Sequence, residues 1–176
     1  MYYLGVAVDA SNREVRFVAL RVANPEAMPE FRTLAYGEHD VPAAMRDLHA
    51  ATLSTLGELP AEAVAVRRMD PPPPRRSPNG SGGGLRTATV DRLLAEGAVL
   101  AAAREAAEIV NHVTGQDAAA RLGLQSKDDA LKAAKAFLKG HGQPVTKWSE
   151  ATMVAQTLTQ PGRASTIPAN EEAPYS

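Results

Sequence analysis

Three acidic residues are the candidates for chemistry in this sequence. Asp9 ends the apolar run "YYLGVAVD", Asp70 follows the run "AVAVRRM", and Glu150 lies in the C-terminal segment "WSEATMVAQTL". Carboxylates contributed by several elements can hold two divalent cations about 4 Å apart and so cleave a phosphodiester. The three residues are therefore candidate catalytic residues, and their chemistry depends on the elements that position them.

A second candidate group is cationic and surrounds a segment rich in proline and glycine. The segment "RRMDPPPPRRSPNGSGGGLR" could lay guanidinium groups along a nucleic-acid backbone. It could equally be a solvated connector whose arginines only keep it soluble. Its glycines lack the following lysine of a Walker loop, which excludes nucleotide hydrolysis by that route. The candidate nucleic-acid contacts in this segment are Arg67, Arg68, Arg75, Arg76 and Arg86.

Composition sets bounds on the class of protein. The chain has 176 residues, a net charge of -1 and no cysteine, so disulfides and thiolate sites are excluded and a reducing cytoplasm is favoured. The nearly neutral charge means that any phosphate binding must come from local clusters of cations. No segment approaches the length of a membrane span. The length and the pattern predict one domain over residues 1–160, with a flexible loop at 70–86 and a disordered tail at 161–176.

The periodicity predicts an α/β domain that positions these side chains. Strands are expected over residues 3–10, 14–22, 31–39, 62–70 and 108–113, and helices over residues 41–57, 87–107, 126–140 and 149–159. Three leading strands followed by alternating helices and strands imply a mixed sheet with helices on both faces. Ser126 and Ser149 are expected to cap their helices. Gly97 costs about 1 kcal/mol relative to alanine inside a helix, which predicts a close approach of that helix to the sheet.

This order of elements, with an aspartate in the first strand, resembles the ribonuclease-H-like fold. Within it, the chain is most similar to the RuvC-type Holliday-junction resolvases. The resemblance covers residues 1–160 and is carried by "LGVAVDAS", "AVAVRRM", "LRTATVDRLLAEGAVLAAAREAAEIVNHV" and "TGQDAAARLGLQSKDDALKAAKAFL". It implies a five-stranded mixed sheet with three antiparallel leading strands, a metal-binding aspartate at Asp9, branched DNA as a partner and a homodimer. It also implies a short helix before a loop with glycine and lysine, which makes Lys127 a further candidate nucleic-acid contact.

The chain departs from the family where the resemblance implies further metal ligands. The family's fourth-strand glutamate falls on Arg67 or within one residue of it, and the final helix offers only Glu150 where a pair of acids is implied. A fixed cation there would outweigh one carboxylate. We therefore predict that Arg67 neutralises Asp9 and that the metal site is lost. In the structural interpretation, Asp9 caps the turn at Ser11 and Asn12 or pairs with an arginine.

Three functions remain open at this point. The first is a RuvC-like scaffold that binds branched or structured DNA with lost or impaired nuclease activity, for which no cofactor is expected. The second, which the resemblance implies, is an active metal-dependent endodeoxyribonuclease of the junction-resolvase type. Its rearranged site would use Asp9, Asp70 and Glu150 with Mg²⁺ or Mn²⁺. The third is a non-catalytic protein-interaction module, which an apolar patch between Val90 and Leu100 would favour.

Overall fold

The computed structural model describes residues 1–37, 41–70 and 87–160. Its strands are β1 (Tyr2–Asp9), β2 (Glu14–Arg21), β3 (Glu30–Ala35), β4 (Ala61–Arg67) and β5 (Ile109–Val113). Its helices are α1 (Val41–Glu58), α2 (Thr87–Ala106), α3 (Gly115–Arg121), α4 (Lys127–Gly140) and α5 (Val145–Gln156). None of these helices is long and apolar enough to cross a membrane.

The strands form one mixed sheet in the order β3-β2-β1-β4-β5. β2 pairs antiparallel with both β1 and β3, whereas β4 pairs parallel with β1 and with β5. The predicted sheet is confirmed. Because β1, β4 and β5 run parallel, their carboxyl ends meet at one edge, which is where sheets of this kind place their ligands.

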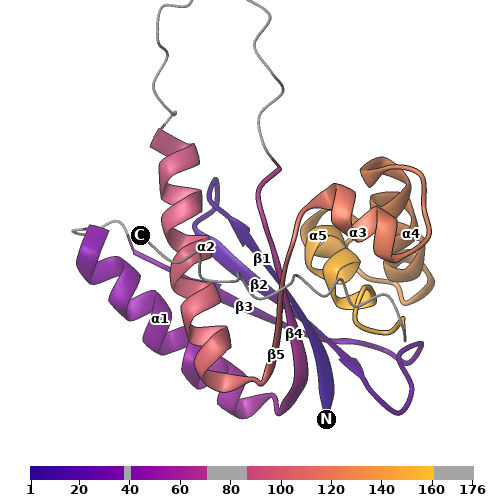
Figure 1. The fold of residues 1–176 in the computed structure, drawn as a ribbon, viewed down its shortest axis with the longest axis horizontal. Coiled ribbons are helices and arrows are strands. Elements are labelled where there is room, and N and C mark those ends of the chain that lie inside the picture. Colours follow the sequence, from indigo (N-terminus) through magenta and orange to yellow (C-terminus); the bar gives the residue numbers. More distant parts are fainter. Residues whose placement is uncertain (38–40, 71–86, 161–176) are drawn as a thin grey trace, which may run out of the picture.

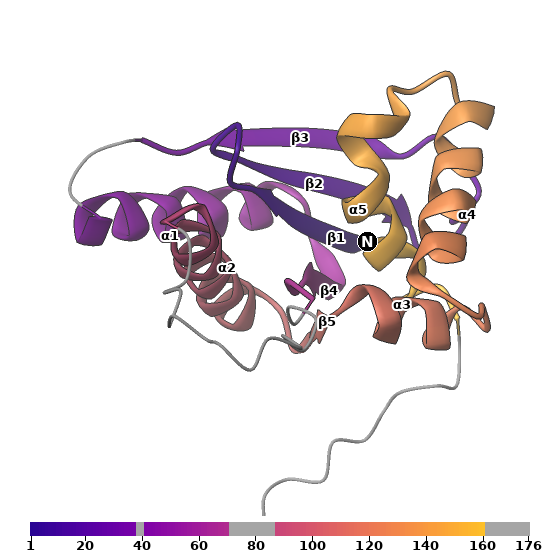
Figure 2. The same ribbon diagram turned by 90° about the horizontal axis from the view of Figure 1, so that it is seen from above.

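Helices cover both faces of the sheet, as Figures 1 and 2 show. One face packs against α1 and α2 through a cluster that includes Leu4, Val6 and Val8 of β1. The opposite face packs against α5, with Ala7 in that second core region. The alternating side chains of β1 therefore supply both cores, which is why the strand is apolar along most of its length.

The contact between β1 and α5 is close at a glycine. A Cβ placed on Gly5 would lie 2.0 Å from the Ala151 carbonyl oxygen and 2.6 Å from the Ala155 amide nitrogen. By contrast, a Cβ on Gly97 would meet nothing within 4 Å. The prediction that Gly97 marks a close approach of α2 to the sheet is wrong, and the close approach lies at Gly5 instead.

One helix start differs from the sequence prediction. α5 begins at Val145 after Pro144, four residues before the predicted cap, and Ser149 is buried within the helix rather than capping it. The short helix α3 follows Thr114, whose hydroxyl and amide form a capping box with Asp117. The cap of α4 is confirmed, because the Ser126 side chain accepts a hydrogen bond from the Asp129 amide. The predicted tail and all of the predicted loop except Asp70 lie outside the described residues.

Candidate functional site

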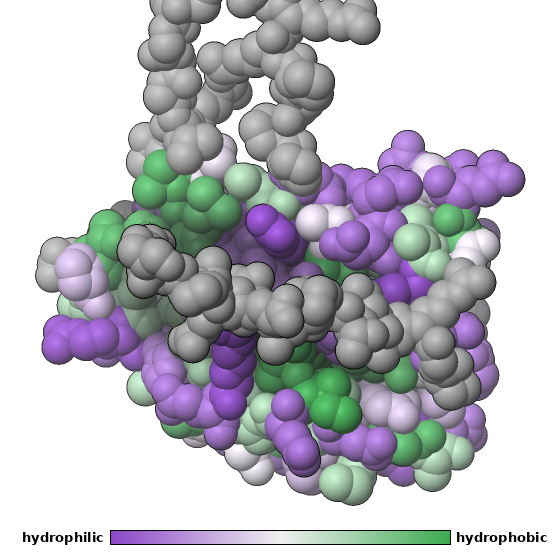
Figure 3. All heavy atoms as spheres, viewed as in Figure 1, coloured by the Kyte–Doolittle hydropathy of each residue, from purple (hydrophilic) through white to green (hydrophobic). Residues whose placement is uncertain are grey.

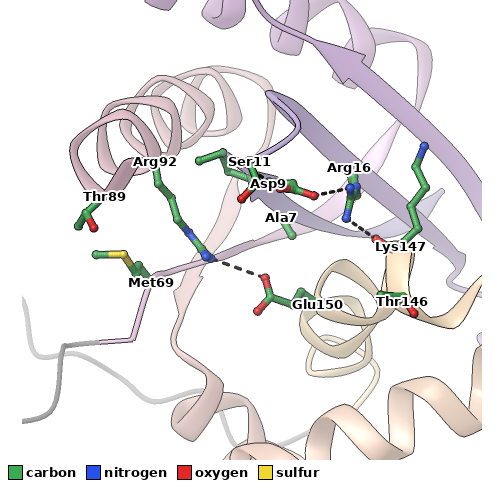
Figure 4. A pocket seen from close by; sticks show the side chains of 12 residues that line it. Ala7, Asp9, Ser11, Arg16, Met69, Thr89, Arg92, Thr146, Lys147 and Glu150 are labelled. Atoms are coloured by element: carbon green, nitrogen blue, oxygen red, sulfur yellow. Dashed lines mark hydrogen bonds and ion pairs between the residues drawn. The ribbon is translucent and has the colours of Figure 1, made fainter. Parts of the chain in front are cut away.

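A surface cavity of about 410 Å³ lies at the carboxyl end of β1, between α2 and the first turns of α5. Figure 4 shows side chains from β2, α2 and α5 converging on it. Its charged lining consists of Asp9, Arg16, Arg92, Lys147 and Glu150. The cavity therefore presents three cations and two carboxylates.

Asp9 is held by the turn that follows β1 and by an arginine. One carboxylate oxygen accepts hydrogen bonds from the amides of Ser11 and Asn12, at 3.1 and 3.2 Å, and the other accepts from the Asn12 side chain at 2.8 Å. The same oxygen pairs with the guanidinium of Arg16. Partial burial would raise the pKa of Asp9, but the hydrogen bonds from Asn12 and Ser11 and the charge of Arg16 lower it overall. Both contacts of the structural interpretation are thus present.

Arg16 is the cation that neutralises Asp9, so the prediction that Arg67 does so is wrong. Arg16 follows Glu14 by two positions on β2, which puts both side chains on one face of the sheet. Its Nε lies 3.2 Å from the Glu14 carboxylate, and its Nη1 donates to the carbonyl of Lys147 at 2.9 Å. Arg16 therefore ties β1 and β2 to the first turn of α5, with its donors directed at the protein.

Arg67 ends β4 with a side chain that is only 1% exposed. Its guanidinium donates to the Asp70 carboxylate at 2.7 Å and to the backbone carbonyl of Arg68, and lies 3.9 Å from the Glu150 carboxylate. Since these contacts face inward, the position of Arg67 gives no support to direct contact with a nucleic acid. Arg68, the next residue, is exposed.

Asp70 joins β4 to α3 and α4 rather than lining the cavity. Its carboxylate accepts from the Lys127 ammonium at 2.6 Å and from the Gly115 amide at 2.8 Å, in addition to Arg67. Partial burial would raise the pKa of Asp70, but the hydrogen bonds from Lys127, Gly115 and Arg67 lower it to about 2. Lys127 and Asp70, both candidate site residues, therefore neutralise one another.

The lowered pKa of Asp70 predicts an acid-sensitive contribution to stability. Because the pKa is about 2 when folded against an ordinary 3.8, the carboxylate stabilises the fold above pH 4 and loses this effect as the pH falls towards 2. We expect Asp70→Asn to cost about 1–2 kcal/mol at pH 6, after allowance for its partial exposure, and much less at pH 2.5. Urea unfolding at both pH values measures this. Asp47→Asn, at an exposed position on α1, is the control, and an equal loss at both pH values for Asp70→Asn would contradict the assignment.

A second arginine links two further carboxylates across the cavity. Arg92 of α2 donates from Nε to Glu96 at 2.7 Å, and its Nη2 lies 3.6 Å from the carboxylate of Glu150 on α5. Glu96 is only 2% exposed and also accepts from the Met69 amide at 3.1 Å. Arg92 therefore occupies the space between two acids, as a bound cation would in a metal site.

These donors do not fit the divalent cations that the resemblance implies. Such cations need several hard oxygen ligands with uncompensated negative charge, whereas Asp9 and Glu150 already face arginines. Across residues 1–37, 41–70 and 87–160, no three His, Cys, Asp or Glu side chains form a group that could hold a metal. The set Asp9, Asp70 and Glu150 does not converge, because Asp70 is directed to α3 and α4.

Sequence reasoning found some of these residues and missed others. Asp9 and Glu150 were singled out and do share the cavity, and Arg75, Arg76 and Arg86 lie outside the described residues. Glu14, Arg16, Arg92, Glu96 and Lys147 were missed. Arg92 and Glu96 are four residues apart, and this spacing in a helix predicts an ion pair from the sequence alone. The contacts of Arg16 and Arg92 with α5 join residues that are far apart in the sequence, so the sequence does not predict them.

The mixed sheet and its strand order are those of a ribonuclease-H-like fold, and solved RuvC structures share this fold. RuvC from Thermus thermophilus superposes with a TM-score of 0.57 at 19% identity, covering 89% of this chain and 92% of that one. T. thermophilus RuvC in complex with a Holliday junction substrate gives a TM-score of 0.56 at 18% identity, covering 88% and 89%. No family model and no curated protein matches the sequence.

Proposed function

We propose that this protein binds branched or structured DNA through its RuvC-like domain, residues 1–160. We further propose that it acts in the cytoplasm and has lost metal-dependent cleavage of DNA. One observation carries the proposal: at the sheet edge where the resemblance implies metal ligands, Asp9 and Glu150 face arginines, and Lys147 lines the same cavity. An edge of this composition suits phosphate contact better than metal binding. The Holliday junction bound to the similar T. thermophilus RuvC supports the class of DNA.

The experiment is a binding titration with a labelled four-way junction, a duplex and a single strand in EDTA, followed by incubation with Mg²⁺ or Mn²⁺. We expect the junction to bind best and to remain uncut. If about four phosphates are neutralised, affinity falls roughly 10²-fold between 50 and 200 mM salt. A resolvase that cuts the same junction is the positive control. Failure to bind any DNA at low salt would reject the proposal, and cutting in Mn²⁺ would favour the active endonuclease.

Several cationic side chains outside the cavity are candidates for further contacts with the DNA backbone. Arg68 is exposed at the end of β4, next to the predicted arginine-rich loop. Lys127 keeps a partly exposed ammonium, although that ammonium is paired with Asp70. Arg75, Arg76 and Arg86 remain predictions. Arg67 is left out of the proposed interface because it is buried.

An apolar stripe on α2 supports self-association. Val90, Leu93 and Leu94 are exposed at helical spacing, and Leu94 lines a small pocket together with Val41 of α1. Figure 3 shows apolar surface over the N-terminal part of α2. We propose that this stripe mediates a homodimer, which brings two copies to one junction. The same stripe favours the protein-interaction alternative, in which a protein partner binds and DNA does not.

A further inference from the structure

We propose that the cavity at the end of β1 receives the sugar–phosphate backbone directly, with Arg92 and Lys147 as its phosphate contacts. This inference rests on the proposed function and adds to it a site and a mode of binding that needs no metal.

Arg92 and Lys147 retain donors that Arg16 does not. Within the described part of the chain, Nη2 of Arg92 is buried and makes no hydrogen bond, although it faces Glu150 at 3.6 Å. The ammonium of Lys147 makes none there either. Its nearest acid is Glu14 at 3.7 Å, and it lies 5.2 Å from the centre of the Trp148 ring. By contrast, the guanidinium of Arg16 is bonded to the carboxylates of Asp9 and Glu14 and to the backbone carbonyl of Lys147.

The two cations approach from different sides. In Figure 4, Arg92 reaches into the cavity from α2 towards Glu150, whereas Lys147 stands on the opposite rim beyond Arg16. Successive phosphates of a strand crossing the cavity would therefore meet a guanidinium on one side and an ammonium on the other. Arginine offers a planar fork of donors and lysine a mobile point charge, and both suit phosphate oxygens.

The start of α5 borders the same cavity and has no side-chain cap. Pro144 is its N-cap and makes no side-chain capping hydrogen bond, so the first backbone amides of the helix lack the usual cap. Thr146, in this first turn, lines the cavity. Open amides and the positive end of the helix dipole favour an anion there.

The acids around these cations decide the size of ligand. Asp9 and Glu150 line the cavity, and Glu14 and Glu96 lie behind its cations. These four carboxylates outnumber the three cations Arg16, Arg92 and Lys147 by one, so the cavity has no excess positive charge with which to hold a small free anion. A phosphate that is part of DNA is held in place by the rest of the nucleic acid, and needs only the free donors. The chemical class of ligand is therefore a polynucleotide backbone.

The test is fluorescence anisotropy of a labelled four-way junction in EDTA with the wild type, Lys147→Gln, Arg92→Gln and the control Lys132→Gln. Lys132 is a 76%-exposed lysine on α4. We expect Lys147→Gln and Arg92→Gln each to weaken binding roughly fivefold to tenfold and to reduce the salt slope by about one, with Lys132→Gln unchanged. Thermal melts establish that each variant is folded. Arg92→Lys, which keeps the charge, should lose less affinity for the junction than Arg92→Gln.

The outcomes separate this inference from the proposed function. If the wild type binds the junction but Lys147→Gln and Arg92→Gln bind as tightly as Lys132→Gln, the cavity is not the phosphate site and the inference fails alone. If the wild type binds no DNA, the proposed function itself is overturned. If binding rises with Mg²⁺ and this gain disappears in Asp9→Asn, a metal site operates and the metal-free inference is overturned.

Discussion

Gly5→Ala is expected to destabilise the protein by about 3 kcal/mol or more, because the added methyl group would overlap the backbone of α5. The Cβ would lie 2.0 Å from the Ala151 carbonyl oxygen and 2.7 Å from the Ala155 Cβ. Neither neighbour is the end of a flexible side chain, so the whole helix must shift away from the sheet. That shift would also move Lys147 and Glu150, which α5 presents to the cavity. The urea midpoint of the variant measures the loss.

Gly97→Ala is the matched control for this substitution. Gly97 lies in α2, with nothing within 4 Å of an added Cβ, so alanine gains helix propensity there and should raise stability by up to about 1 kcal/mol. The two variants therefore move the urea midpoint in opposite directions. Equal midpoints for Gly5→Ala and the wild type would show that α5 does not sit against β1 as described.

Arg67→Ala is expected to cost about 3 kcal/mol, which lowers the melting temperature by roughly 10 °C. The side chain is among the largest fully buried ones in the described residues, so its removal leaves a cavity at the end of β4. The substitution also removes one of the three hydrogen-bond donors to Asp70, the other two being Lys127 and the Gly115 amide. It removes one of the two arginines that face Glu150 as well. Thermal unfolding at neutral pH measures the loss.

Two variants separate packing from charge at this position. Arg68→Ala removes an exposed arginine one residue away and should change stability by less than about 0.5 kcal/mol. Arg67→Met keeps most of the buried volume without the charge, and Asp70 retains Lys127. We expect it to lose less than Arg67→Ala does. If Arg67→Ala and Arg68→Ala have the same melting temperature, the buried network around Arg67 does not contribute to stability.

Much of the fold could be predicted because its elements leave local signals. Alternating apolar residues mark β2, a continuous apolar run marks β1, and Ser126 marks the start of α4. The start of α5 was misplaced because Pro144 supplies no polar cap, whereas Ser149 imitates one from inside the helix. Gly97 was misread because a helical glycine signals close packing only when a neighbour is near, and the sequence does not show neighbours.

The site was harder to predict because its charges are paired across elements. The sequence places Arg67 at or within one residue of the glutamate position that the resemblance implies, yet the cation that faces Asp9 is Arg16. The residues near Arg16 in the sequence do not indicate that it joins β1 and β2 to α5, because its hydrogen bond to the Lys147 carbonyl spans 131 residues. Lys147 went unnoticed because a lysine in the first turn of a helix is unremarkable until the sheet edge beside it is known.

Arg16 and Arg92 have one more consequence for this edge of the sheet. A dissolved ion occupies its ligands only as far as its free concentration allows, so its occupancy follows supply and is abolished by chelators. Guanidinium groups that are part of the polypeptide are present in fixed stoichiometry and do not exchange with the medium. On the proposed function, we therefore expect the charge balance around Asp9, Glu96 and Glu150 to be set when the chain folds and to be the same in magnesium-rich and magnesium-starved surroundings.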